Sequence, residues 1–421
     1  MVRGPAWIRK LQTLSLLYIA VFLTRIGFGT IIVVFPVYVL AGSALTGIIT
    51  ALYPAVEGLS ALPVGAYVDR KGRRRAFVLG MVLISIFTFA IGLTPNLLSV
   101  SGAHALSGLA AALVTVSSLT MITDLTVEKN RGAGMGAFDL ANLGGYGVGI
   151  AIGAAFLTIF KTNLGYSFLV VAGILGAATG FVYFSLREPP HSVQQKKGLR
   201  EMYDNLTGEV AAIFPIWFSL TVVVGFYLFL PKIAKNINPA ADFSQSAWLI
   251  LLGLAVLGGG ALLFGRISDK IGRTRTMAIG AVGEIGFLLL LPDLFPKLIA
   301  IAPGTSWVES YNQIGPIIIV GGLFFFLGAA IIPSILAYIG DKAAQDFRGS
   351  AMGLYSLMLS AGIALGTVLA GITDELAGVQ GVFYSAVIIF SGLSLTSAFL
   401  LHREKRLAST GDVEKTQNKP I

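Results

Sequence analysis

Twelve long apolar runs constrain the fold of this chain more than any other feature of its sequence. They cover about residues 13–40, 44–66, 76–94, 97–123, 133–160, 164–186, 211–231, 246–265, 276–292, 314–340, 350–373 and 379–401. A helix of about 20 mostly apolar residues crosses a bilayer. Only 12% of the residues are charged, against about 25% in soluble domains. The sequence therefore predicts an all-α membrane protein with 12 transmembrane helices.

Lysine and arginine are distributed very unevenly between the connections. If both termini are cytoplasmic, 25 of the 30 basic residues lie in inner segments, 4 lie in outer ones, and Arg25 lies inside a helix. Inner loops of membrane proteins carry the excess of basic residues. The sequence thus predicts a multi-pass protein of the plasma membrane with both termini cytoplasmic. The net charge of +9 is then an orientation signal and a contact for anionic lipids of the bilayer, not a nucleic-acid surface.

Two motifs recur in the same order in the two halves of the chain. Residues 65–75 and 265–275 both read G-x-x-x-D-[RK]-x-G-R-x-R, and residues 124–136 share an Asp, Arg, Gly and Met pattern with residues 341–353. Arginine and glycine are common in such loops, but two motifs in one order indicate a repeated unit. Two parallel repeats are a known plan of transporters. We expect two six-helix halves with a cytoplasmic linker and tail: 1–186, 187–210 (linker), 211–401 and 402–421 (tail).

The first motif, between the second and third helices, resembles the signature loop of the major facilitator superfamily of transporters. The resemblance implies two halves that rock around a midplane site, and inner loops that lock the cytoplasmic side in the outward-facing state. Arg73 follows Asp69 by four residues and can reach Asp124. Surface ion pairs are worth about 0–1 kcal/mol, which suits a reversible latch; the alternative is that the cations only anchor the topology. The expected latch residues are Gly65, Asp69, Arg73, Asp124, Arg131, Gly265, Asp269, Arg273, Asp341 and Arg348.

The fifth helix carries a ladder of small residues that lets helices approach closely: Gly145, Gly149 and Gly153. The ladder resembles the motif G-x-x-x-G-P-x-x-G-G of the family's drug–proton antiporters, with Ile150 in place of the proline and Ala154 in place of the last glycine. The first helix is similar to the same branch, because residues 27–36 follow G-x-G-x-x-x-P-V-x-P, with Val33 for the first proline. The resemblance implies efflux of small hydrophobic or amphipathic compounds in exchange for protons.

Five ionisable residues lie at membrane depth, namely Arg25, Glu57, His104, Asp139 and Glu284. A charged side chain at the bilayer centre costs roughly 2.5–3.5 kcal/mol on insertion scales, so these groups should face protein or water. The first, second, fourth and fifth helices each carry one stripe of polar or small residues at helical spacing. Such stripes can line a water-accessible cavity.

We expect Arg25 and Glu57 to pair, and the pair to be exchanged for substrate or a proton during transport; the alternative is a permanent structural salt bridge. The resemblance places His104 at the family's helix-4 arginine, which is linked to proton transfer, and the unperturbed pKa of histidine, about 6.5, suits that role. A packing histidine is the other interpretation. Asp139 belongs to the pathway or braces Arg131, and Glu284 is expected to be structural, since the ninth helix is peripheral in the family.

The favoured function is a secondary transporter that moves a small molecule by alternating access, coupled to protons. One alternative is a transporter of an organic anion that binds Arg25, because a carboxylate or phosphate needs such a cation. Another is a membrane receptor that does not transport. We expect no enzyme, because the chain has no cysteine, three histidines and no nucleophile–base arrangement. No cofactor or metal is expected, and the resemblance implies a monomer.

Overall fold

A computed structural model describes residues 6–126, 128–188, 208–239, 247–300, 307–342 and 348–417. Within these ranges the chain is helical, with turns and short links and no strand. The helices are α1 (Ala6–Tyr38), α2 (Ser43–Lys71), α3 (Arg73–Leu93), α4 (Leu97–Leu125), α5 (Glu128–Ile159), α6 (Gly165–Ser185), α8 (Gly208–Ala211), α9 (Phe214–Ile237), α10 (Ala247–Ile271), α11 (Arg273–Ala300), α12 (Trp307–Gly328), α13 (Ile331–Lys342) and α14 (Arg348–Gln417).

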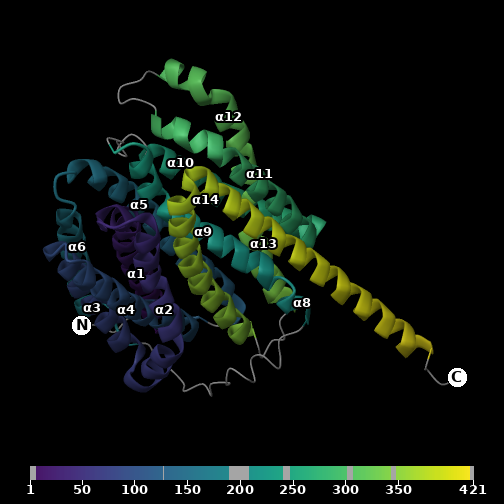
Figure 1. The fold of residues 1–421 in the computed structure, drawn as a ribbon. Coiled ribbons are helices and arrows are strands. Elements are labelled where there is room, and N and C mark those ends of the chain that lie inside the picture. Colours follow the sequence, from purple (N-terminus) through teal and green to yellow (C-terminus); the bar gives the residue numbers. More distant parts are fainter. Residues whose placement is uncertain are drawn as a thin grey trace. The chain divides into compact units, whose positions relative to one another are not determined.

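Eleven helical segments of the described chain are long and apolar enough to cross a membrane. The last of them, Leu357–Glu404, has 48 residues, about twice what a bilayer needs. Its backbone leaves helical geometry at Gly378, where φ is 62° and ψ is −165°, and α14 turns sharply in Figure 1. This turn separates the predicted helices 350–373 and 379–401. The prediction of an all-α fold with twelve membrane helices is therefore confirmed.

The described residues form two compact units. Unit 1 comprises the described residues within 1–195, 228–254 and 367–375, and unit 2 comprises those within 196–227, 255–366 and 376–421. The expected division into halves 1–186 and 211–401 stays a prediction, and most of the expected linker lies outside the described residues. The expected tail, 402–421, is helical as far as Gln417.

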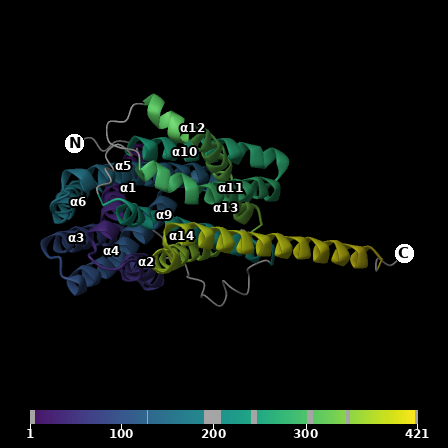
Figure 2. The same ribbon diagram turned by 45° about the horizontal axis from the view of Figure 1, so that its top comes forward.

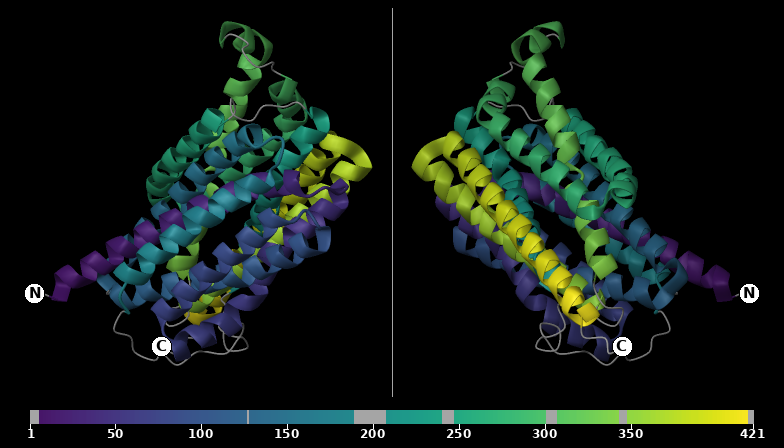
Figure 3. Two further views of the ribbon diagram at one scale, coloured as in Figure 1. Left: turned by 90° about the vertical axis from the view of Figure 1, so that its left-hand side faces the viewer. Right: turned by 90° about the vertical axis from the view of Figure 1, so that its right-hand side faces the viewer.

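In unit 1, α1 packs along α5, and α4 packs against both α2 and α3. Figure 3 shows α1 and α5 running side by side. The close approach depends on glycine: a Cβ added at Gly149 would lie 2.2 Å from the carbonyl oxygen of Ile26, and one at Gly145 would lie 2.5 Å from that of Phe22. The glycine ladder of the fifth helix thus lies at the contact with the first helix.

In unit 2, α11 packs against α12 and α13 (Figure 2). These two helices belong to one apolar span, Ile314–Ile339, which is interrupted at Ala329 and Ala330. The expected single helix 314–340 is therefore two helices. Pro333 contributes to the interruption, because it has no N–H and cannot bond the carbonyl of Ala329 four residues before it.

Candidate functional site

Four helices of unit 1 bring one polar cluster together, which we call the central cluster: Arg25 (α1), which is buried, and Glu57 (α2), Thr115 (α4) and Tyr146 (α5), which are half-buried. Arg25 Nη2 donates to Thr115 Oγ1 at 3.0 Å, and the Thr115 hydroxyl donates to Glu57 Oε1 at 3.1 Å. Arg25 Nη1 donates to the Tyr146 hydroxyl at 3.0 Å. The side chain of Arg25 is 5% exposed. The two expected charges are thus joined through a hydroxyl, and the expected pair is indirect.

Aromatic rings hold the guanidinium of Arg25 in place. Its Cζ lies 5.0 Å from the centroid of Phe28 and 5.2 Å from that of Tyr146. A desolvated cation over a ring gains about 2 kcal/mol. Arg25 is therefore oriented by helices α1, α4 and α5 together, and a smaller or differently shaped cation would lose these contacts.

Several buried polar atoms near the central cluster have no hydrogen-bond partner in the described protein: Arg25 Nε, Tyr53 Oη, His104 Nδ1 and Asn142 Oδ1. Proteins pair about nine in ten of their buried polar groups, so this concentration is unusual. The rings of Phe28, Tyr53 and His104 connect three of these positions, with centroids 6.0 and 5.5 Å apart. The region therefore holds donor and acceptor atoms that the described protein leaves unpaired.

His104 lies in a tightly packed position on α4. Its ring stacks on Phe35 with centroids 3.6 Å apart, and Nε2 lies 3.4 Å from the carbonyl oxygen of Thr50. One turn later, a Cβ added at Gly108 would lie 2.3 Å from the carbonyl oxygen of Tyr53, so the backbones of α4 and α2 touch. The packing explains a buried histidine here, and its free Nδ1 keeps the proton-transfer hypothesis open.

The side chains of Asp139, Arg131 and Arg348 lie outside the described residues, so their expected roles stay predictions. Of the two expected motif glycines, Gly65 is buried and Gly265 is half-buried.

The two copies of the repeated motif have the same geometry. Arg73 Nε donates to Asp124 at 3.0 Å and Arg273 Nε donates to Asp341 at 3.0 Å. Each arginine also pairs with the aspartate four residues before it, Asp69 and Asp269.

The glycine between the helices of each motif has a positive φ, 99° at Gly72 and 98° at Gly272. Such values favour glycine, because a Cβ would be strained there. Arg73 contacts Asp124, which the sequence placed within its reach, and Arg273 contacts Asp341 in the second copy.

Glu188, which sequence reasoning missed, completes the first motif. Its carboxylate accepts from the backbone N–H groups of Arg73 at 2.7 Å and Arg74 at 2.9 Å. It therefore caps the start of α3, where unpaired N–H groups favour a negative charge. The available signal was that α3 begins with three arginines and no acidic residue. Glu188 lies just after the sixth apolar run, but Glu128 also follows a helix end, so this signal does not single out Glu188.

A second group of polar contacts lies at the start of α2, on the side that the predicted topology assigns to the cell exterior. Ser43 Oγ donates to Asp374 Oδ2 at 2.5 Å, and the amide of Ala44 donates to Glu375 Oε2 at 2.9 Å. Asn236 Nδ2 donates to the same Asp374 oxygen at 2.7 Å. We call these residues the outer cluster; all belong to unit 1. Sequence reasoning missed the cluster because hydroxyl, amide and single acidic residues at helix ends are common.

Glycines bring the helices of the outer cluster into backbone contact. A Cβ at Gly47 would lie 2.4 Å from the carbonyl oxygen of Thr367, and one at Gly371 would lie 2.3 Å from that of Ser43. Gly42 precedes α2 and provides no side-chain cap. The carboxylate of Glu375 on α14, which accepts from the amide of Ala44, therefore takes the place of a cap.

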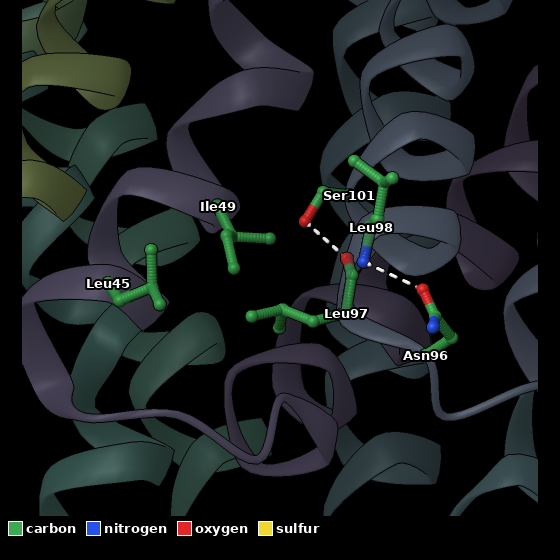
Figure 4. A pocket seen from close by; sticks show the side chains of 6 residues that line it. All are labelled: Leu45, Ile49, Asn96, Leu97, Leu98 and Ser101. Carbon is green, nitrogen blue, oxygen red and sulfur yellow. Dashed lines mark hydrogen bonds between the residues drawn. The ribbon is translucent and has the colours of Figure 1, made fainter.

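A pocket of about 430 Å³ opens beside the starts of α2 and α4. Figure 4 shows its lining by Leu45, Ile49, Asn96, Leu97, Leu98 and Ser101. The lining is mostly apolar, and Leu98 is 83% exposed. No member of the central cluster lines it, and its chemistry suits lipid chains better than a polar substrate.

The chain is similar to known transporters over nearly its whole length. The family model described as Major Facilitator Superfamily matches residues 17–295 and 212–421. Multidrug resistance protein 1 of Bacillus subtilis (strain 168) is 25% identical over 404 residues, which are 93% of this chain and 97% of that protein. The quinolone resistance protein NorA of Staphylococcus aureus (strain MSSA476) is 24% identical over 415 residues, 94% of this chain and 97% of NorA.

Among solved structures, a POT family transporter in complex with 5-aminolevulinic acid superimposes with a TM-score of 0.71. It covers 93% of this chain and 96% of its own, at 14% identity, which speaks for the fold alone. The family model covers most of the chain, and the helices are those of a multi-pass membrane protein. The chain therefore belongs to the Major Facilitator Superfamily, a family of small-molecule transporters.

Proposed function

We propose that this transporter exports hydrophobic or amphipathic compounds in exchange for protons, by alternating access. The observation that carries the proposal is the chain of hydrogen bonds from Tyr146 through Arg25 and Thr115 to Glu57. Through these bonds, side chains of four helices connect a carboxylate and a cation of the membrane interior. The similarity to multidrug resistance protein 1 and to NorA supports the substrate class.

The exchange step follows from the charges of the central cluster. With Glu57 ionised, its charge and that of Arg25 cancel. A lipophilic cation and a proton both need the negative charge of Glu57, so they compete for it. Proton binding leaves Arg25 as an uncompensated buried charge, which costs roughly 2.5–3.5 kcal/mol at the bilayer centre. That cost favours a state in which water reaches the cluster and the proton can leave.

The two inner motifs are proposed as latches of the cytoplasmic side, with both termini in the cytoplasm. Each is a network of one arginine and two aspartates, so its contacts form and break as a unit. Residues Gly65 and Gly265, Arg131 and Arg348 remain part of this proposal. We further propose a monomer in the plasma membrane, with His104 and Asp139 on the proton pathway.

A second candidate is transport of an organic anion. The buried Arg25 Nε has no partner in the described protein, and an arginine offers a carboxylate two parallel hydrogen bonds. In this mechanism the substrate displaces Thr115 from the guanidinium of Arg25. When no substrate is bound, Glu57 compensates the charge of Arg25.

The test measures proton movement in proteoliposomes with an internal pH dye. Two panels are added in turn, lipophilic cations and small organic anions. Export in exchange for protons predicts proton flux with the cations, and its loss in Glu57→Gln, with the size-exclusion profile unchanged. A response to anions alone would support the second candidate. Full activity and an unaltered pH profile in Glu57→Gln would remove Glu57 from the coupling role.

A further inference from the structure

Unit 2 contains a buried carboxyl group that the proposed cycle does not use. Glu284, in the middle of α11, is 5% exposed. Its Oε1 lies 2.6 Å from the hydroxyl of Tyr227, on α9. Both residues belong to unit 2. The sequence favoured a structural role for Glu284, since the ninth helix is peripheral in the family.

No cation compensates this carboxyl group. None of the ion pairs among the described residues involves Glu284. Its one hydrogen-bonding partner there is Tyr227. On α11 the nearest charged residues are Arg275 and Asp293, each nine positions from Glu284 and about 13 Å along the axis. The other helices packed around it carry Glu309 on α12, Asp341 and Lys342 on α13, and Lys232 and Lys235 on α9. Lys232 is five positions from Tyr227, about 7.5 Å along α9, and its ammonium donates to the carbonyl of Ala41. The neutral acid is therefore the form that the surroundings favour.

The carboxyl group faces the interruption between α12 and α13. A Cβ added at Gly328, the last residue of α12, would lie 3.0 Å from Glu284 Oε2. The interruption falls inside an apolar span. Membrane helices are broken in this way mainly where the freed backbone groups are buried in protein or bind a substrate or ion.

Glycines of α11 hold the two half-helices against Glu284. A Cβ at Gly283 would lie 2.4 Å from the backbone nitrogen of Gly328, and one at Gly280 would lie 2.9 Å from that of Ile331. Ile331 is the first residue of α13. The N–H groups in the first turn of α13 have no partner within the helix and form the positive end of its dipole. This positive end stabilises the ionised form of a nearby carboxyl group. The site thus offers support to both protonation states.

We propose that Glu284, with Tyr227, is a second proton-binding site, located in unit 2 at the interruption of α12 and α13. The inference rests on the proposed proton coupling. In the ionised state the Tyr227 hydroxyl donates to the carboxylate. On protonation a carboxylate oxygen takes a proton from hydronium and releases a water molecule, and the neutral acid keeps its hydrogen bond to Tyr227. The charge change at the half-helix ends alters the stability of the interruption, which couples proton binding to the arrangement of α12 and α13.

The test follows the carboxylic C=O stretch by infrared difference spectroscopy of the purified protein across about pH 5 to 9. We expect a titrating band that disappears in Glu284→Gln and remains in Glu309→Gln, a matched change of a carboxyl at the end of α12. Tyr227→Phe, which keeps the ring, should shift the titration midpoint. The proposal would be overturned if the band of Glu284 did not change with pH, or if no band were lost in Glu284→Gln. A midpoint that follows sodium rather than pH would overturn it too.

The same variants are then compared in proteoliposomes. We expect Glu284→Gln to lose substrate-driven proton movement while substrate counterflow, which needs no net proton transfer, is retained. Proton movement equal to that of the Glu309→Gln control would contradict a coupling role. If the unaltered protein itself moves no protons, the proposed function fails, yet the infrared titration still decides whether Glu284 binds a proton.

Discussion

At the scale of the residue, Thr115 is the part of the central cluster on which the arrangement depends most. It accepts from Arg25 and donates to Glu57, so its hydroxyl transmits a change at one charge to the other. A direct salt bridge in the same place would hold both charges more tightly. A hydroxyl between them leaves the carboxylate open to a competitor.

Thr115→Val should reduce substrate-driven proton flux by about tenfold or more, since a hydrogen bond to a charged group is worth about 1.5–3 kcal/mol. The change keeps the shape of the side chain and removes its hydroxyl. Thr120→Val is the matched control on the same helix, because among the described residues the Thr120 hydroxyl bonds to the carbonyl of Val116 alone. Both are measured with the pH dye. Equal proton flux in the two variants would mean that the Thr115 hydroxyl between Arg25 and Glu57 has no part in coupling.

The sequence placed Arg25 and Glu57 at membrane depth and predicted polar or small stripes on the fourth and fifth helices, where Thr115 and Tyr146 lie. It did not show that Thr115 lies between the charges. Periodicity gives the face of a helix, but not its height relative to its neighbours. That height depends here on Gly108 and Gly145, whose missing side chains let α4 and α5 approach α2 and α1.

At the scale of the element, the two inner motifs share a geometry but differ in burial. Arg73 and Asp124 are 3% and 12% exposed, whereas Arg273 and Asp341 are 22% and 55% exposed. The repeat predicted the contacts of both motifs correctly. It could not predict the difference, because the first motif is covered by Glu188 and the end of α6, which the repeat does not include.

Asp124→Asn should therefore destabilise the protein more than Asp341→Asn. Removing one partner of a buried ion pair costs about 3–5 kcal/mol, and an exposed pair is worth about 0–1 kcal/mol. The thermal midpoint of each variant in the same detergent gives the comparison. A larger loss in Asp341→Asn would contradict the burial argument.

The interruption between α12 and α13 is the element that the sequence did not predict. Hydropathy treats Ile314–Ile339 as one span, since both half-helices are apolar. Pro333 was the available signal, but proline also occurs inside unbroken helices here, as Pro54 and Pro63 do in α2.

At the scale of the whole molecule, the chain contains no cysteine, which makes a cross-linking test of alternating access direct. Ser43 and Asp374 are in contact, and a disulfide between residues 43 and 374 would hold the outer cluster closed. We expect Ser43→Cys with Asp374→Cys to lose transport on oxidation and to regain it with a reductant. Each single variant serves as the control. Transport that continues in the cross-linked protein would show that the outer cluster stays closed throughout the cycle.

The start of α2 has one more consequence. The N–H of Ala44 is protected from exchange with solvent by its hydrogen bond to Glu375 of α14. No side chain of the residue before α2 caps this turn, so the protection depends on Glu375. Local opening determines how fast such a proton exchanges with deuterium. The deuterium uptake of this first turn therefore reports how much of the time the start of α2 is apart from the part of α14 just before Gly378, in the unmodified protein and without a substrate.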